Sequence, residues 1–342
     1  MSTNLAETFS EALKTAGIHA KLQHITPLVP EASTRRYFRL HLSDGSTLVA
    51  VYEDTATATT TTNMQNVVSV QHFLATGGVA VPQIFYTDMA SGIMLQQDLG
   101  DVSLNQILKD QPDQADVFYQ DAILHMLTWQ RLANDGKCPA FGLSFDVTKL
   151  MFEFDFFIEH TLRGYYRTTA PETELKEIRK AFLQIAEELA APTHKVFNHR
   201  DYHSRNIQLV GASTPLSHLA LKQYVIDFQD ARLGLMQYDL CSLLCDAYAP
   251  LTLERRSRLL DFAFEQGKDV HRQSREEFDH FFALSAFQRI VKAMGTFGRQ
   301  AALGRDDFAA YLQPARQTLS EVVIDDARLG NLVQTLFRVC DR

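Results

Sequence analysis

Two hydrophobic periods organise the first hundred residues. A repeat of four at Leu5, Phe9 and Leu13 predicts a short helix over 5–16. A repeat of two, in which apolar and polar side chains alternate, predicts a strand over 38–42. An Asp-Gly turn signal follows at once, so we expect the apolar run at 48–52 to return beside it as a second strand. Two further short apolar runs are expected to be strands, at 81–85 and 93–95.

A run of threonines separates the second and third of these strands. Residues 55–62 hold six threonines in eight positions, and we interpret them as a flexible loop. Thr62 or Asn63 is expected to cap a helix that follows. The apolar positions of that helix are Val67, Val70 and Leu74. Its end is predicted at the glycine pair 77–78.

Beyond residue 101 the pattern becomes mostly helical, with two β-like interruptions at 196–210 and 224–228. These patterns predict an α+β fold with two lobes. Residues 1–97 are expected to form a small, β-rich lobe, and 98–342 a larger, mostly helical lobe. The single Trp129 lies in a helical pattern and is expected in the core.

Composition narrows the class of protein. The 342 residues are 46% hydrophobic and 22% charged, which is ordinary for a folded globular chain. A net charge of −8 argues against a nucleic-acid partner. No apolar run approaches the roughly 18 residues of a membrane span, and we expect neither a membrane segment nor a signal peptide. The four cysteines show no zinc or disulfide spacing, so a reduced, cytoplasmic protein is expected; nothing implies an obligate protein partner.

The candidate chemistry lies in two short segments that each follow apolar residues. His199 to Asn206 reads H-R-D-Y-H-S-R-N, and Ile226-Asp227-Phe228 follows about twenty residues later. Phosphoryl transfer from ATP needs a carboxylate that accepts the proton of the attacking hydroxyl, and oxygen ligands that hold magnesium on the phosphates. Asp201 fits the first role, and Asn206 with Asp227 fits the second.

Each of these residues also has a purely structural interpretation. Asp201, Asn206 and Asp227 are residue types that commonly cap helices or form turns, but their occurrence together in this spacing favours the catalytic interpretation. His199 is interpreted as bracing the loop. His203 is expected to line the metal or acceptor site. A zinc site at H-x-D-x-H ranks low, because no further ligand cluster has convincing spacing.

Residues 199–206 and 226–239 resemble the aminoglycoside phosphotransferase (choline/aminoglycoside kinase-like) superfamily, which has a protein-kinase-like fold. Within it the chain looks most like the anomeric N-acetylmuramate/N-acetylglucosamine kinases of cell-wall recycling. The motifs that carry this closer resemblance are E-A-S-T-R-R-Y-F-R at 31–39, D-L-G-D at 98–101 and D-F-Q-D-A at 227–231, of which R-R-Y-F-R and D-F-Q-D-A are the more specific.

The resemblance implies a cytoplasmic, ATP-dependent kinase of the anomeric hydroxyl of an amino sugar, with Asp201 as base and Asn206 and Asp227 as Mg²⁺ ligands. It places adenine against 97–99, that is Gln97, Asp98 and Leu99. It also places Ser33 and Thr34 in the loop that covers the phosphates, and Glu153 near the sugar.

One feature departs from the kinase scheme. The strand at 48–52 lacks the lysine that meets the α- and β-phosphates. Arg35 or Arg36 is our hypothesis for the replacement, because an arginine fork binds phosphate. The alternative is that these arginines and Arg39 are solvated, or pair with Glu31, Asp44 or Glu53.

Two other functions stay open. The acceptor is alternatively another small alcohol, such as choline, homoserine or an aminoglycoside, with Asp230 in an acidic acceptor pocket. Asp155, Glu159 and Asp239 are further candidates for that pocket, although Asp155 and Glu159 fit better as solvated helix positions. The missing lysine alternatively indicates a catalytically silent nucleotide-binding regulator. The intact set of Asp201, Asn206 and Asp227 favours an enzyme.

Overall fold

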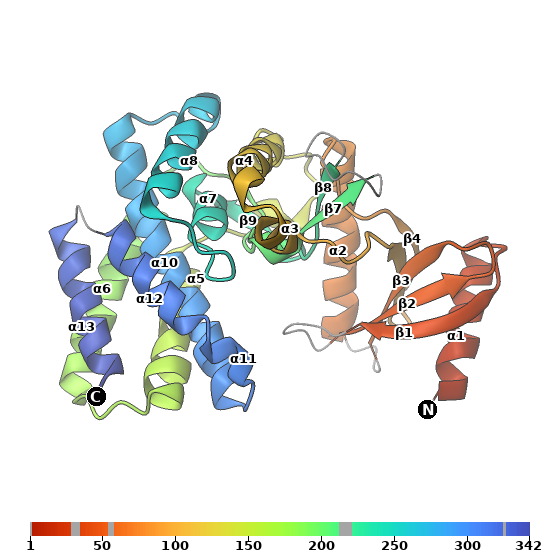
Figure 1. Cartoon of the computed structure of the whole chain (residues 1–342), viewed down its shortest axis with the longest axis horizontal. Helices are drawn as coiled ribbons and strands as arrows, with labels where there is room; N and C mark the ends of the chain where they lie inside the picture. The colour runs from red at the N-terminus through yellow and green to blue at the C-terminus, as the bar shows by residue number, and fades with distance from the viewer. Residues whose placement is uncertain (1, 29–34, 54–57, 212–220, 324–325) are drawn as a thin grey trace. The chain divides into compact units, whose positions relative to one another are not determined.

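The structure is a computed structural model, and it describes residues 2–28, 35–53, 58–211, 221–323 and 326–342. The chain divides into two compact units (Figure 1). Unit 1 comprises residues 1–102, 134–139 and 208–229, and unit 2 comprises 103–133, 140–207 and 230–342. Unit 1 thus includes residues 98–102 and two segments from further along the chain. The boundary expected at residue 97 stays a prediction.

Unit 1 is built on an antiparallel sheet of five strands in the order β1-β2-β3-β5-β4. Helix α1 (Ser2–Thr15) contacts this sheet, and Phe9 and Leu13 pack with Phe38, Leu40 and Leu95 in one buried cluster. The alternation in the second strand therefore has the expected cause, since its apolar side chains face this core. The strands are β1 (Leu22–Leu28), β2 (Arg36–Leu42), β3 (Thr47–Tyr52), β4 (Ile84–Asp88) and β5 (Ile93–Gln97).

Three details of unit 1 differ from the sequence-based expectation. Strand β1 was not expected, because it is an edge strand whose burial does not alternate. Strand β4 begins three residues later than expected, after Pro82, which lacks the N–H that a strand needs. Helix α2 spans Ala58–Thr76, so the loop interpretation of 55–62 is wrong from residue 58 onward, and neither Thr62 nor Asn63 is its N-cap.

Burial stabilises α2 in spite of its threonines. Val67, Val70, Phe73 and Leu74 are all buried, and that burial outweighs the modest helix penalty of threonine, about 0.5 kcal/mol per residue. The predicted end is confirmed: the N–H of Gly77 donates to Phe73, and Gly78 has φ +79°, a conformation that favours glycine.

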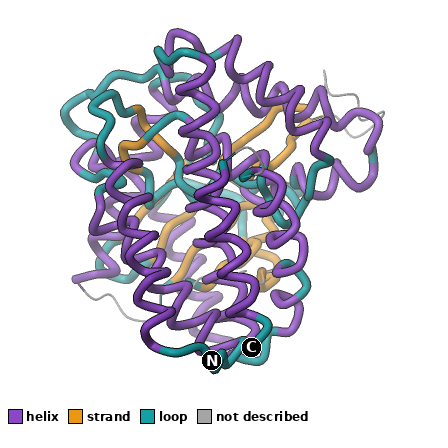
Figure 2. The backbone as a smooth tube through the Cα atoms, turned by 90° about the vertical axis from the view of Figure 1, so that its left-hand side faces the viewer, coloured by secondary structure: helices purple, strands orange, loops and turns teal. Residues whose placement is uncertain are grey.

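Unit 2 is mostly helical (Figure 2). Its centre is the 28-residue helix α10, which contacts α5, α6, α7 and α12 and is buried on most of its faces. The α-helices are α3 (Leu104–Asp110), α4 (Ala115–Gln130), α5 (Val147–Phe157), α6 (Glu172–Ala190), α7 (Gln237–Leu244), α8 (Leu253–Gln266), α9 (Lys268–His271), α10 (Arg275–Ala302), α11 (Asp306–Ala309), α12 (Leu312–Val322) and α13 (Ala327–Cys340).

Shorter elements complete the fold. A π-helix, η3 (Ile158–Tyr165), continues α5. Strands β6 (Val196–Asn198) and β9 (Arg232–Gly234) pair antiparallel, and β7 (Ile207–Gly211) pairs with β8 (Leu221–Val225). The 3-10 turns of the described residues are η1 (Pro112–Gln114), η2 (Pro139–Gly142) and η4 (Ser204–Asn206). Strands β6, β7 and β8 thus overlap the β-like segments 196–210 and 224–228, whereas residues 199–206 and 226–228 are not strands. Strand β9 was not expected.

The core includes the residues that the sequence placed there. Trp129 is buried, as predicted, and its indole N–H donates to Asp239 at 3.2 Å. Cys138, Cys241, Cys245 and Cys340 are all buried. Within the described ranges, no helix combines the length and apolar character that a membrane crossing requires.

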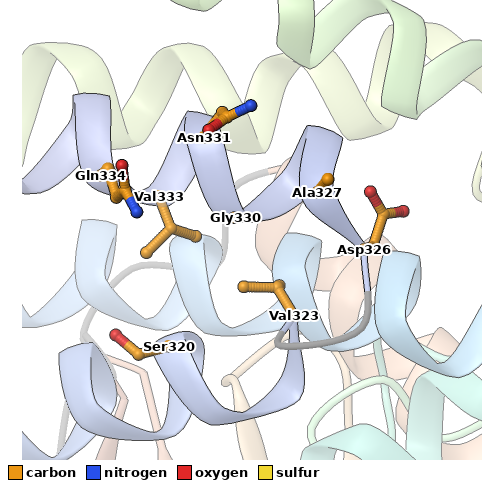
Figure 3. A pocket seen from close by; sticks show the side chains of 8 residues that line it. All are labelled: Ser320, Val323, Asp326, Ala327, Gly330, Asn331, Val333 and Gln334. Atoms are coloured by element: carbon orange, nitrogen blue, oxygen red, sulfur yellow. The ribbon is translucent and has the colours of Figure 1, made fainter.

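A hollow of about 340 Å³ lies between α12 and α13 (Figure 3). Its charged lining residue, Asp326, is already used as the N-cap of α13, where its carboxylate accepts the N–H of Leu329 at 3.0 Å. Nothing in this hollow matches the chemistry expected of the chain. Its lining residues are Ser320, Val323, Asp326, Ala327, Gly330, Asn331, Val333 and Gln334.

Candidate active site

The segment 199–206 leaves the buried strand β6 as a tightly anchored loop. Asp239, a buried residue of α7, accepts the N–H of His199 at 2.7 Å and that of Arg200 at 2.9 Å. Arg200 has φ +83°, which is unfavourable for a residue with a Cβ. The loop is therefore held in a strained but well-bonded conformation, and Asp239 supports its backbone from beneath.

Asp201, the expected base, faces two cations from α10. The Lys292 ammonium hydrogen-bonds Oδ1 of Asp201, and Nη2 of Arg289 lies 3.3 Å from the same oxygen. Burial raises the pKa of the Asp201 carboxyl, but Lys292, Arg200 and Arg289 oppose it and hold that pKa well below its usual range. The carboxylate is thus charged at neutral pH and is aimed by a helix ninety residues further along the chain.

Asn206 closes the same loop. It ends the 3-10 turn η4, and its side-chain amide donates to the backbone carbonyl of Asp201 at 2.9 Å. Because that bond uses the nitrogen, the amide oxygen is free to serve as the hard ligand that Mg²⁺ prefers. The preceding Ser204 is fixed by Asp246, which accepts both its N–H and its hydroxyl. The structure therefore brings Asp201 and Asn206 together as expected.

Asp227 lies in unit 1, two residues after β8. Its φ is +68°, and its carboxylate accepts the side-chain amide of Gln229 at 2.7 Å. A non-glycine residue in this region marks a position where backbone strain is tolerated, as is common at functional sites.

Among the described residues, no three His, Cys, Asp or Glu side chains gather as a metal cluster, so the zinc reading of 199–203 gains no support.

The residues expected to hold the nucleotide are engaged within unit 1. Ser33 and Thr34 lie outside the described residues. Nε of Arg35 lies 2.9 Å from a Glu53 carboxylate oxygen, and Arg36 stacks over the rings of Phe38 and Tyr52. Arg35 thus makes one of the ion pairs of the alternative interpretation. Their proposed phosphate contact stays a prediction.

The segment 97–101 is held by an arginine whose role the sequence did not reveal. Arg39 of β2 donates to both oxygens of Asp98, at 2.6 and 3.1 Å, and to both of Asp101, at 2.9 and 2.8 Å. Those hydrogen bonds, with Asp101 contributing most, raise the pKa of Arg39. Gly100 adopts φ +77° and donates its N–H to Asp98. The D-L-G-D motif is therefore a turn clamped onto the sheet.

Gln97 and Leu99 flank Asp98 in this clamped segment. The N–H of Gln97 donates to the carbonyl of Gln83 at 2.8 Å, and Leu99 is buried. Their side chains and backbone are thus fixed by unit 1 itself. The proposed contact of 97–99 with adenine stays a prediction.

The three expected substrate residues have different surroundings. Glu153 is buried and meets Gln288 at 2.9 Å, Arg200 at 3.2 Å and Lys149 at 3.3 Å. Asp230 is half exposed and pairs with Nη1 of Arg200 at 2.8 Å. The His203 ring lies against Tyr248, with 5.2 Å between ring centroids. Arg200 therefore joins Glu153 and Asp230, and contact of any of the three with substrate stays a prediction.

The acidic acceptor pocket finds little support in unit 2. Asp239 is wholly buried beneath the loop, and Asp155 forms an exposed pair with Arg179 at 2.7 Å. Lys149, Arg232, Arg289 and Lys292 instead bring positive charge to Glu153, Asp201 and Asp230. Sequence spacing gives no sign of this, because the groups come from helices and strands far apart along the chain.

A scan against protein-family models matches residues 24–279 to the phosphotransferase enzyme family. Among curated proteins, the N-acetylmuramate/N-acetylglucosamine kinase of Pseudomonas putida is 31% identical over 281 residues, covering 80% of this chain and 76% of the relative. The protein of that name from Neisseria meningitidis is 28% identical over 285 residues, covering 80% of this chain and 78% of the relative.

Solved structures of low sequence identity share the fold. Choline kinase LicA from Streptococcus pneumoniae aligns with a TM-score of 0.62 at 12% identity, covering 94% of this chain and 99% of that one. The aminoglycoside phosphotransferase of a streptomycin–ATP–APH(2")-IIa ternary complex aligns with a TM-score of 0.61 at 14% identity, covering 96% and 98%. The expected α+β, kinase-like fold is confirmed, and the chain belongs to the phosphotransferase enzyme family.

Proposed function

We propose that this phosphotransferase moves the γ-phosphate of ATP to the anomeric hydroxyl of an amino sugar of the N-acetylmuramate or N-acetylglucosamine type. The observation that carries the proposal is the loop of Asp201 and Asn206, in which a charged carboxylate is aimed by Lys292 and Arg289. The names of the relatives that match 80% of the chain support the choice of acceptor.

In the proposed reaction Asp201 accepts the proton of the anomeric hydroxyl as its oxygen bonds to the γ-phosphorus, and the bond from that phosphorus to the β–γ bridging oxygen breaks. The products are the sugar 1-phosphate and ADP. Asn206 and Asp227 offer the oxygen donors that would hold Mg²⁺, whose charge would neutralise the phosphates. The clamp of Arg39 on Asp98 and Asp101 would present the backbone of 97–99 to adenine.

The decisive experiment is phosphate transfer from labelled ATP with magnesium to a panel of acceptors. We expect label on N-acetylmuramate or N-acetylglucosamine, in a product that has lost its reducing end, because only the anomeric phosphate blocks it. Transfer to choline, homoserine or an aminoglycoside in place of the sugars would contradict the proposal. Transfer to no acceptor by a folded, ATP-binding protein would favour the regulator.

The base is tested by Asp201→Asn, which keeps the side chain's shape but cannot accept the proton. We expect turnover to fall roughly 10²–10⁴-fold. The matched control is Asp279→Asn, since Asp279 lies on α10 and is held by an arginine of the same helix, Arg275, at 2.7 Å. Equal activity of the two variants would contradict the assignment of Asp201.

A further inference from the structure

Three cations share two carboxylates on one side of the Asp201 loop. Arg200 pairs with Glu153 and Asp230, and Lys149 pairs with Glu153. The third cation, Arg232, interacts electrostatically with both carboxylates but is repelled by Arg200. All five residues belong to unit 2. Both carboxylates are thus already used by other cations.

Arg232 is the cation left over. The residue is only 8% exposed, so most of its side chain is removed from water. Its Nε donates to the backbone carbonyl of Asp230 at 3.2 Å, and its guanidinium lies 5.4 Å from the ring centroid of Phe145. Its two terminal nitrogens meet no acceptor in the part of the chain that the structure describes. A buried cation without a carboxylate partner is costly unless an anion completes it.

The pKa of two of these cations supports the same view. Burial lowers the pKa of Arg232, and the repulsion from Arg200 adds to it. Burial likewise lowers the pKa of Lys149, again with repulsion from Arg200. Burial is the largest cause of both shifts and the repulsion from Arg200 adds to it, so an anion bound beside either group would stabilise its charged form.

Lys149 and Glu153 lie on helix α5, which packs beside α10 in unit 2 (Figure 1). The Lys149 ammonium lies 5.0 Å from the ring centroid of Phe152, and Phe152 is 61% exposed. An exposed aromatic ring beside a cation offers an apolar face and a positive charge together, which suits a sugar that bears an acidic group.

We infer that Arg232 and Lys149 form an anion subsite of the acceptor, which binds a carboxylate carried by the sugar. This inference rests on the proposed function and deepens it: an acidic amino sugar is the preferred acceptor over its neutral counterpart. The acceptor, rather than ATP, is the source of the anion because the subsite is joined through Arg200 to the base that touches the acceptor hydroxyl.

The test compares N-acetylmuramate, which carries a carboxylate, with N-acetylglucosamine, which lacks it. Unmodified protein should show the higher kcat/KM for N-acetylmuramate. Arg232→Met should lower the ratio of the two kcat/KM values by about tenfold or more, as expected for loss of a charge-assisted hydrogen bond. Lys149→Met should also lower this ratio of kcat/KM values, and Arg232→Lys should lower it less than Arg232→Met does. The KM for ATP should not change.

Arg316→Met is the matched control, because Arg316 also lies on an aromatic ring, that of Phe337, but has its own carboxylate partner in Asp341. It should leave the ratio unchanged. If thermal unfolding shows that Arg232→Met is not folded, the variants Lys149→Met and Arg232→Lys test the subsite in its place. Equal losses on both sugars, or a raised KM for ATP, would overturn the subsite alone. Transfer to neither sugar by the unmodified protein would overturn the proposed function as well.

Discussion

The Lys292 ammonium is one of the two cations that hold the carboxylate of Asp201, the candidate base. Burial lowers the pKa of Lys292 to about 8; Arg289 and Arg200 push it the same way, while Asp201 and Glu153 oppose them. We expect turnover to fall as the pH rises through about 8, because the neutral amine no longer fixes the Asp201 carboxylate. The pH dependence of kcat measures this directly.

Lys292→Arg provides the comparison, because arginine does not titrate in this range. It should remove the fall near pH 8, and the same alkaline fall in this variant would refute the role of Lys292. Destabilisation of the fold by deprotonation of Lys292 would not explain this fall in turnover. Since the folded pKa lies below the ordinary 10.5, the lysine's own contribution to the free energy of unfolding rises with pH between about 8 and 10.5.

At Arg200 the ion pairs of the side chain offset an unfavourable backbone angle. At φ +83° glycine would be more stable by about 1 kcal/mol from the backbone alone. Arg200→Gly also leaves the buried Glu153 with one cation fewer, which costs about 3–5 kcal/mol for a buried pair. We therefore expect a net loss of stability in denaturant unfolding.

Substitution by glycine should change the free energy of unfolding in the opposite direction at two other arginines with positive φ. Arg167 (φ +52°) and Arg272 (φ +55°) are exposed, so glycine relieves their backbone without breaking a buried pair. The free energy of unfolding of each variant should rise by up to about 1 kcal/mol. A stabilised Arg200→Gly protein would show that the ion pairs to Glu153 and Asp230 contribute less than the strain.

At the scale of elements, close packing of α10 against the π-helix η3 depends on one glycine. A Cβ at Gly298 would lie 2.8 Å from Cα of Thr161, and the Thr161 hydroxyl donates to the carbonyl of Met294 at 2.8 Å. Gly298→Ala should therefore lower the free energy of unfolding by about 1–3 kcal/mol through overpacking.

Gly330 is the control for this packing argument. It lies inside helix α13, where an added Cβ meets only the carbonyl of Val323 at 3.9 Å. Gly330→Ala should raise the free energy of unfolding by about 0.5–1 kcal/mol, because alanine is the better helix former. Thermal unfolding of both variants checks the pair. The same sign at both positions would contradict the packing explanation for Gly298.

Local patterns account for the elements that the sequence predicted correctly. Strands β2 and β3 follow from alternation and an Asp-Gly turn, and the end of α2 follows from a glycine pair, since each signal lies within a few residues. The edge strand β1 has no such signal, because the burial of its side chains does not alternate. Strand β9 is only three residues long, which is too short for a period to be recognised in the sequence.

Contacts between distant residues account for what the sequence did not predict in the site. Lys292 lies 91 residues from Asp201, and Arg39 lies 59 residues from Asp98. No spacing rule connects such pairs. The loop of Asp201 and Asn206 was predictable because five residues separate the two in one motif, whereas the cations that surround it became visible only in the fold.

Nucleotide and metal bound together should raise the free energy of unfolding of the chain. A ligand that binds only the folded chain raises its free energy of unfolding by about 2.7 kcal/mol at 100 times Kd. We expect ADP with Mg²⁺ to raise Tm by several degrees, and a chelator to reverse most of that rise. Asn206→Ala and Asp227→Ala should each reduce the magnesium-dependent part. Asp279→Asn, a surface change on α10, should keep the full shift. If both alanine variants keep the full magnesium-dependent shift, the metal is held by other residues, whatever the acceptor proves to be.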